Sequence, residues 1–297
     1  MKKSSSVFVA VLCLVSFFYS VAAFGGEQYL AEVSVDYSQT KGGDSKSASY
    51  GLSGEVFFEP VRTAEHAYAE AAFLERIGSA RVLAYNLESE SGGFKGDGQA
   101  FGLGINYAKP NFPLAISAFY FDSSSKLDAP LSSKGEADGY DLSVGNYFLP
   151  RLLAGITYSR YKAESTYLTT SFTSKDSEYS LFAKYVHELG HGRELSLGGT
   201  VTRETYESSF SDEKANNINS ALSVDYYFNR GLSAGIDIKR GAGEIEGYEG
   251  MTYGVNVRYF ITPRISVSVG YDKFFNAHND EGFDDDKSYD VALAARF

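Results

Sequence analysis

Apolar and polar residues alternate with a period of two along most of the chain. In the stretch 265–271 four apolar side chains share one face, and two serines and a glycine share the other. A period of two places successive side chains on opposite faces of a β-strand, so the pattern predicts strands with one apolar and one polar face. No stretch shows an equally strong helical stripe.

The alternation predicts fourteen strands. They are expected at 28–39, 48–59, 67–87, 99–108, 114–122, 138–148, 151–162, 177–188, 193–206, 217–228, 231–240, 248–260, 264–275 and 287–297. The stretch 67–77 is rich in Ala, Glu and Leu, which favour helix, but it lies between strands in the same rhythm and is interpreted as strand. A true strand number of twelve or sixteen stays open.

The connections alternate in character. Short ones rich in turn residues are expected at 60–66, 109–113, 149–151, 190–192, 229–231 and 262–264, and longer polar ones at 40–47, 88–98, 123–137, 163–176, 207–216, 241–247 and 276–286. Tight turns at one end, longer loops at the other and strands of about ten residues are typical of outer-membrane barrels. A soluble β-sandwich also alternates but needs no such difference between its connections.

Aromatic residues near both ends of the apolar faces agree with a barrel in a membrane, where they form interfacial girdles. The expected pairs are Tyr29 with Tyr37, Tyr50 with Phe58, and Tyr289 with Phe297. The predicted fold class is all-β, an antiparallel up-and-down transmembrane β-barrel of about fourteen strands.

Residues 1–23 differ from the rest of the chain. Lys2 and Lys3 precede an apolar run at 7–19, and small residues follow at 21–23, which predicts a secretory signal peptide; a retained N-terminal anchor is the alternative. The predicted domains are therefore the signal peptide at 1–23 and the barrel at 24–297. Cys13, the single cysteine, lies within the predicted signal.

Composition narrows the function further. The mean hydropathy of −0.22 argues against a protein with many membrane-spanning helices, and 43% apolar residues argue against a disordered chain. A net charge of −11 would be repelled by phosphate backbones, so nucleic acid is not an expected partner.

The C-terminus carries a resemblance. Alternate residues at the end of the chain are Tyr289, Val291, Leu293, Ala295 and Phe297. This pattern resembles the terminal signal of Gram-negative outer-membrane proteins, which ends in Phe. The resemblance implies recognition by the barrel-assembly machinery and location in the outer membrane of a Gram-negative bacterium.

The size and strand count resemble the monomeric fourteen-strand porins. The residues Glu-Pro-Val at 59–61, followed by Ala-Glu-Ala-Ala-Phe-Leu at 69–74, resemble a group of uncharacterised porins. The resemblance covers the chain after the signal and implies an architecture more than a particular solute.

Fourteen strands about 4.8 Å apart and tilted by about 40° give a backbone radius of roughly 14 Å, which leaves a narrow lumen. The charged residues expected to line it are Glu32, Asp36, Glu55, Glu70, Arg76, Asp141, Lys184, Glu194, Glu204, Asp225, Asp237, Lys239, Arg258, Asp272, Asp290 and Arg296. Most are acidic, which favours cations.

The predicted function is an outer-membrane channel for passive diffusion of small hydrophilic solutes or ions, with a mild preference for cations. Two alternatives remain. The inward charges pair with one another and close the lumen, or the barrel does not conduct and serves a structural, adhesin or receptor role through its surface loops. The expected partners are outer-membrane lipid and lipopolysaccharide, the barrel-assembly machinery, and small hydrophilic solutes.

Two loops have candidate roles. The stretch 123–137 is a candidate for a loop that folds into the lumen. The loop 276–286 holds Asp280, Glu281, Asp284, Asp285 and Asp286. These carboxylates suit divalent ions that bridge lipopolysaccharide, but their spacing fits no standard calcium loop, so we interpret the loop as an acidic, solvated one.

An enzyme is the main rival class. All four histidines, His66, His187, His191 and His278, lie at or near predicted strand ends. His187 and His191 straddle a predicted turn, not a helix face on which that spacing would converge on a metal. We therefore predict no catalytic residues, no metal site and no cofactor.

Overall fold

The computed structural model describes residues 27–128, 133–167, 170–209, 211–243, 249–276 and 286–297. These residues form fourteen strands and one short helix, α2 (Ala71–Glu75). The strands are β1 (Gln28–Gly42), β2 (Ser45–Arg62), β3 (Ser79–Ser91), β4 (Phe94–Lys109), β5 (Phe112–Asp128), β6 (Ser133–Leu149), β7 (Leu152–Tyr167), β8 (Thr170–Gly190), β9 (Arg193–Ser208), β10 (Ser211–Asn229), β11 (Leu232–Gly243), β12 (Gly250–Thr262), β13 (Ile265–Asn276) and β14 (Lys287–Arg296).

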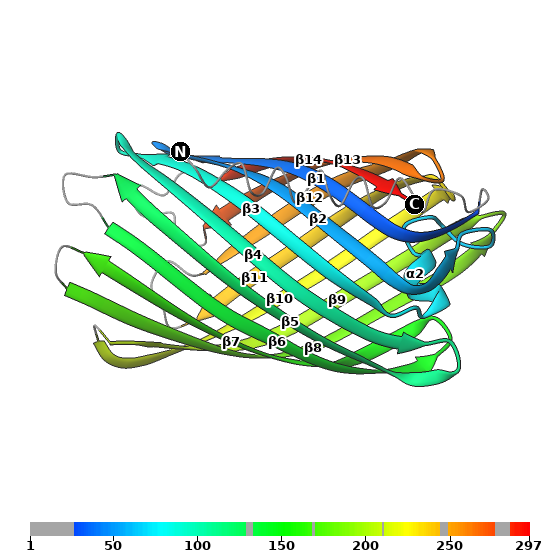
Figure 1. Ribbon diagram of the computed structural model, residues 1–297, viewed down its shortest axis with the longest axis horizontal. Helices are drawn as coiled ribbons and strands as arrows, with labels where there is room; N and C mark the ends of the chain where they lie inside the picture. The colour runs from blue at the N-terminus through cyan, green and yellow to red at the C-terminus, as the bar shows by residue number, and fades with distance from the viewer. Residues whose placement is uncertain (1–26, 129–132, 168–169, 210, 244–248, 277–285) are drawn as a thin grey trace.

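The strands form one closed barrel. Each strand pairs antiparallel with the next in sequence, and β14 pairs with β1, so that Val35 lies opposite Leu293. Figure 1 shows the tilted strands side by side around a single axis. Closure leaves no unpaired edge, which a sheet within hydrocarbon requires. The predicted all-β, antiparallel up-and-down barrel of fourteen strands is confirmed.

The outer face of the barrel is apolar. Large side chains on alternate positions are open to the surroundings, such as Ile156 (60% exposed), Leu181 (64%) and Ile236 (56%). A continuous apolar surface of this extent on a monomer indicates contact with a nonpolar environment, and in an outer-membrane barrel that environment is lipid.

Arginine at Ile236 is expected to lower the free energy of unfolding by about 2–4 kcal/mol, because it places a charge on the lipid face near mid-strand. The matched control is Ser223→Arg, which lies on the inner face opposite Asp237 and is expected to cost less than about 1 kcal/mol. Urea titration of both variants in phospholipid vesicles measures the difference. Equal costs would contradict the assignment of the two faces.

The strands are longer than a membrane crossing requires. β8 has 21 residues and β2 has 18, against about ten needed. They take up most of the stretches predicted as long loops, so that only Gly92 and Gly93, both at positive φ, connect β3 to β4. The prediction of long loops was wrong at these places, because polar residues on both faces still form cross-strand pairs above the membrane.

The largest correction concerns the predicted strand 67–87. β3 begins at Ser79, and residues 63–78 form a separate connection that contains α2. Arg76 ends the helix in a left-handed conformation, at φ 54°. Helix propensity was therefore the better guide here. The connection also replaces the predicted tight turn at 60–66.

Tyr29 is a second correction. It was expected in the outer girdle, but it is 3% exposed and its ring packs edge-on against Phe57 at 5.3 Å. The pairing of β1 with β2 shifts register between Tyr29 and Ala31. β2 advances five residues, from Val61 to Val56, while β1 advances two, and such an irregularity breaks the alternation of faces next to it.

The predicted signal peptide at 1–23 lies outside the described residues and stays a prediction. Among the residues that the structure describes, no helix is long and apolar enough to cross a bilayer.

Candidate functional site

The inner face of the barrel encloses a cavity of about 630 Å³. One side of its wall includes Glu32, Glu55, Arg258 and Arg296. The other side includes serine and threonine side chains of β6 to β9. Side chains from the connection 63–78, such as Phe73, also line it. The lumen thus has a polar wall and a partly apolar end.

Fourteen of the sixteen residues predicted to line the lumen lie on strands, on the face that alternates with the exposed apolar residues. They are Glu32, Asp36, Glu55, Asp141, Lys184, Glu194, Glu204, Asp225, Asp237, Lys239, Arg258, Asp272, Asp290 and Arg296. The other two, Glu70 and Arg76, lie in the connection 63–78 and not on a strand.

Five aspartates of the inner face lie directly opposite glycines on a neighbouring strand. The pairs are Asp36–Gly51, Asp225–Gly235, Asp237–Gly254, Asp272–Gly254 and Asp290–Gly270. A Cβ at Gly51 would lie 2.3 Å from the carboxylate of Asp36, and one at Gly270 would lie 2.2 Å from that of Asp290. The missing side chains therefore give these carboxylates room to lie along the wall.

These aspartates form one acidic stretch. The charges of Asp36 and Asp290 interact, as do those of Asp290 and Asp272, and those of Asp225 and Asp237. The strands involved, β1, β14, β13, β11 and β10, follow one another around the barrel with only β12 between. Lys239 and Arg258 also lie on this side and offset part of the charge, so five aspartates against two cations leave it net negative.

A second acidic group lies on the wall between β6 and β9. Glu178 is directly opposite Glu204, and Tyr161 donates a hydrogen bond to Asp141 at 2.8 Å. The charge of Asp176 also interacts with that of Glu204. Sequence reasoning missed Asp176 and Glu178, although both alternate with the apolar Tyr179 and Leu181 and that alternation was sufficient to find them.

Arg81 is a further residue of the inner face that the sequence analysis missed. It lies opposite Glu55, and its guanidinium stacks over the ring of Phe119 at 4.6 Å from the centroid. It was missed because the predicted strand 67–87 had the opposite phase, which put even-numbered residues inside.

The connection 63–78 crosses one end of the barrel. This end carries Gln28, Phe297 and the tight turns, and corresponds to the periplasmic end. The backbone N–H of Tyr68 donates to the carbonyl of Arg230 at 2.9 Å, and Arg296 donates to the carbonyl of Tyr68 at 2.8 Å. The segment that leaves β2 therefore reaches the opposite wall, and α2 lies within the barrel mouth (Figure 1). We call residues 63–78 the plug segment.

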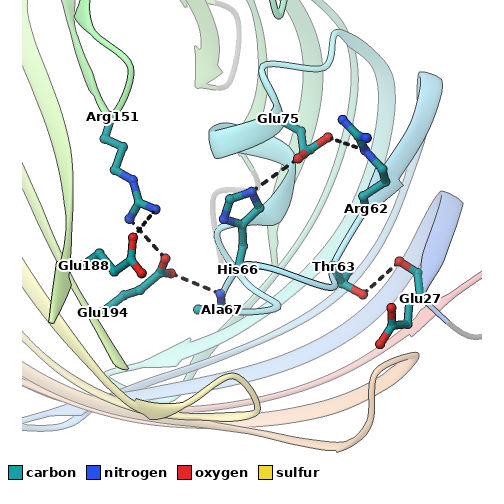
Figure 2. A network of polar contacts seen from close by, with 9 residues as sticks. All are labelled: Glu27, Arg62, Thr63, His66, Ala67, Glu75, Arg151, Glu188 and Glu194. Atoms are coloured by element: carbon teal, nitrogen blue, oxygen red, sulfur yellow. Dashed lines mark hydrogen bonds and ion pairs between the residues drawn. The ribbon is translucent and has the colours of Figure 1, made fainter. Parts of the chain in front are cut away.

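Two buried carboxylates fasten the plug segment to the wall. Glu70, 4% exposed, pairs with Lys184 at 2.6 Å and accepts a hydrogen bond from Tyr227 at 2.8 Å. Glu194, 3% exposed, accepts from the backbone N–H of Ala67 at 3.1 Å and pairs with Arg151 at 3.3 Å (Figure 2). Glu70, predicted on a strand lining the lumen, belongs instead to the plug segment.

The base of the plug segment has its own contacts. Glu75 pairs with Arg62 at 2.9 Å and with His66 at 3.2 Å, and the hydroxyl of Thr63 donates to the carbonyl of Glu27 at 3.0 Å (Figure 2). Arg76 stacks on Tyr147 and faces rim carbonyls, so it lies at the mouth and not along the pore.

The expected folding-in of 123–137 is wrong in the described part of that stretch. Residues 123–128 continue β5 and 133–137 continue β6, paired to one another. The barrel is narrowed at the other end, by the plug segment.

The histidines form no site with one another. His66 belongs to the plug segment, and His187 contacts the hydroxyl of Tyr185 at 3.2 Å. His191, at φ 56°, lies in the turn after β8, and His278 lies outside the described residues. Within the described ranges no three metal-ligating side chains gather.

A closed barrel with an apolar exterior and a charged interior is the architecture of outer-membrane proteins, channels among them. The chain belongs to the family described as "Putative general bacterial porin", whose model matches residues 1–297.

Several solved structures share the fold. The outer membrane protein Omp33 of Acinetobacter baumannii is 18% identical, with a TM-score of 0.56 over 92% of this chain and 100% of that one. A FadL homologue of Pseudomonas aeruginosa is 11% identical, with a TM-score of 0.54 over 93% and 91%. The toluene transporter TodX of Pseudomonas putida is 10% identical, with a TM-score of 0.51 over 93% and 90%. A search of curated protein sequences found no match.

Proposed function

We propose that the protein is a channel for passive diffusion of small hydrophilic solutes or ions, with a mild preference for cations. The observation that carries the proposal is the acidic stretch Asp36, Asp290, Asp272, Asp237 and Asp225, whose carboxylates lie along the inner wall. Rings of carboxylates in a pore attract cations and repel anions. No chemical step is involved, so the proposed role is not enzymatic.

The plug segment favours the second candidate, a non-conducting barrel with a structural, adhesin or receptor role. Ion pairs of two buried carboxylates hold this segment in the periplasmic mouth. Solutes can pass through the barrel only if a passage lies beside the segment or if the segment is displaced. We favour the channel because a barrel with no solute path has no need for a charged, glycine-lined inner wall.

The route to the membrane is also part of the proposal. The predicted signal peptide would direct export, and the C-terminal residues would be read by the barrel-assembly machinery. In the barrel Tyr289, Val291 and Leu293 face outward, each close to half exposed, and Phe297 pairs with Ala31. This outward row is accessible on the last strand, as a recognition signal requires.

Single-channel recording in a planar bilayer tests the function. We expect current steps and a reversal potential, across a KCl gradient, on the cation side. The variant Asp225→Asn with Asp237→Asn is expected to lower the K⁺/Cl⁻ permeability ratio by about half.

The matched control is Asp122→Asn with Asp138→Asn, an aspartate pair directly opposite one another on the outer face of β5 and β6. It removes the same charge and is expected to leave the ratio unchanged. An anion-selective parent, or equal shifts in both variants, would contradict the proposed selectivity.

A further inference from the structure

Four lysines lie directly opposite one another on four adjacent strands. Lys46 of β2 is opposite Lys41 of β1, Lys41 is also opposite Lys287 of β14, and Lys287 is opposite Lys273 of β13. They lie at the end of the barrel opposite the end that carries Gln28 and Phe297. We call these four residues the lysine row.

The lysine row is on the outer face. Lys41 lies on the same face of β1 as the exposed Val35, opposite to the face of the inward Asp36. Lys287 lies on the same face of β14 as the exposed Val291. Lys41, Lys46 and Lys287 are exposed. The ammonium of Lys273 lies 4.1 Å from the ring centroid of Phe275.

Like charges directly opposite on neighbouring strands destabilise a sheet. Elsewhere on the outer face the rim lysines have acidic partners: Lys126 pairs with Asp128, Lys162 with Glu164 and Lys214 with Glu207. In the described part of the chain no carboxylate lies within ion-pair distance of Lys41, Lys46 or Lys287. Glu90 of β3, opposite Lys46, ends the row on one side. Lys41, Lys46 and Lys287 therefore form no ion pair within the described residues, although Glu90 is their nearest acidic cross-strand neighbour.

Tyrosines fix the height of the row relative to the membrane. Tyr37 contacts Tyr50 at 5.1 Å, and Tyr271 contacts Tyr289 at 5.2 Å, on the same outer face of the same four strands. Tyrosine girdles mark the boundary between hydrocarbon and headgroups. The lysines lie two to four residues beyond them, about 7–13 Å along the strands. This is the level of the headgroups in the outer leaflet.

We propose that the lysine row binds the phosphates of the lipid A part of lipopolysaccharide. A phosphorylated lipid matches both parts of the surface, because its phosphates meet the lysines while its acyl chains meet the apolar side chains below the tyrosines. The proposal rests on the outer-membrane location and not on conduction, so it stands or fails independently of the proposed channel.

The test is titration of the full chain, folded in a neutral detergent, with diphosphoryl lipid A, followed by native mass spectrometry. The variant combines Lys41→Gln, Lys46→Gln and Lys287→Gln. About 1 kcal/mol per lysine corresponds to about fivefold each, so we expect a loss in affinity of the order of a hundredfold at low salt. The loss should shrink at physiological salt, which screens exposed charges.

The matched control combines Lys126→Gln, Lys162→Gln and Lys214→Gln, and is expected to change the affinity by less than about twofold, because those lysines are neutralised by acidic neighbours. Unchanged affinity in the lysine-row variant, or an equal loss in the control, overturns the proposal. An equal loss of binding to phosphatidylglycerol vesicles also overturns it, since the row would then be a general anionic-lipid surface. Single-channel conductance of both variants, measured apart from lipid binding, shows whether each variant is folded and whether its channel is unchanged.

Discussion

Replacing residues 64–77 with a flexible Gly–Ser linker is expected to raise the single-channel conductance at least about threefold, because the periplasmic mouth loses the segment that crosses it. Phe57 of β2 lies opposite Ser79, the first residue of β3. Arg62, the last residue of β2, is five residues beyond Phe57 and therefore lies about 17 Å from the start of β3. A linker of about eight residues spans up to about 27 Å and closes this gap without strain.

The matched control is Glu65→Gln, an exposed residue of the same segment for which no contact to the wall is described. It is expected to conduct as the parent does. Equal conductance of the linker variant and the parent would show that solutes already pass beside the plug segment. An absence of current from both would support the non-conducting barrel.

Lys184→Met is expected to release the plug segment. It leaves the carboxylate of Glu70, 4% exposed, without its cation. Removing one partner of a buried pair costs about 3–5 kcal/mol, because the remaining charge stays buried. The docked state should weaken by that amount, and trypsin cleavage after Arg76 in the detergent-solubilised protein should become at least about a hundredfold faster.

Two variants separate this effect from general damage. Lys239→Met removes a lysine from the inner face of β11 and is expected to leave cleavage unchanged. Adding Glu70→Gln to Lys184→Met removes the buried charge and is expected to restore slow cleavage, since the amide keeps a hydrogen bond with Tyr227. Fast cleavage in all three variants would mean that the Glu70–Lys184 pair does not hold the segment.

The sequence predicted the strands well because alternation is a local property. Val35, Ile236 and Val291 face outward as their neighbours required, and most of the predicted inward charges lie on the expected face. Most strand lengths were underestimated, since the extended hairpins lack the apolar residues by which a membrane strand is recognised.

The plug segment depends on contacts that no local pattern contains. The Ala-rich stretch at 67–77 carried a helix signal, but its place in the lumen follows from Glu70 meeting Lys184 and from Glu194 meeting the N–H of Ala67. These partners are far apart in the sequence. The predicted strand 67–87 put even-numbered residues inside, so Arg81 was not recognised as an inward residue.

Tyr29 shows a different limit. Between the pairs Tyr29–Val61 and Ala31–Val56, β2 contains three more residues than β1, and this irregularity reverses the facing of the Tyr29 side chain. The reversal places its ring against Phe57 and under the guanidinium of Arg296, 4.4 Å from the ring centroid. Alternation predicts faces only while pairing is regular, and a bulge is decided by packing across strands.

The central claim is that the apolar face of each strand contacts lipid while the other face encloses water. Cysteine substitutions along β12, one at a time at Val255, Asn256, Val257 and Arg258, test it directly in lipid vesicles, because the only cysteine of the chain, Cys13, lies within the predicted signal. A water-soluble maleimide should label N256C and R258C quickly and leave V255C and V257C unlabelled. Equal labelling at all four positions, or labelling of the apolar pair alone, would contradict the account.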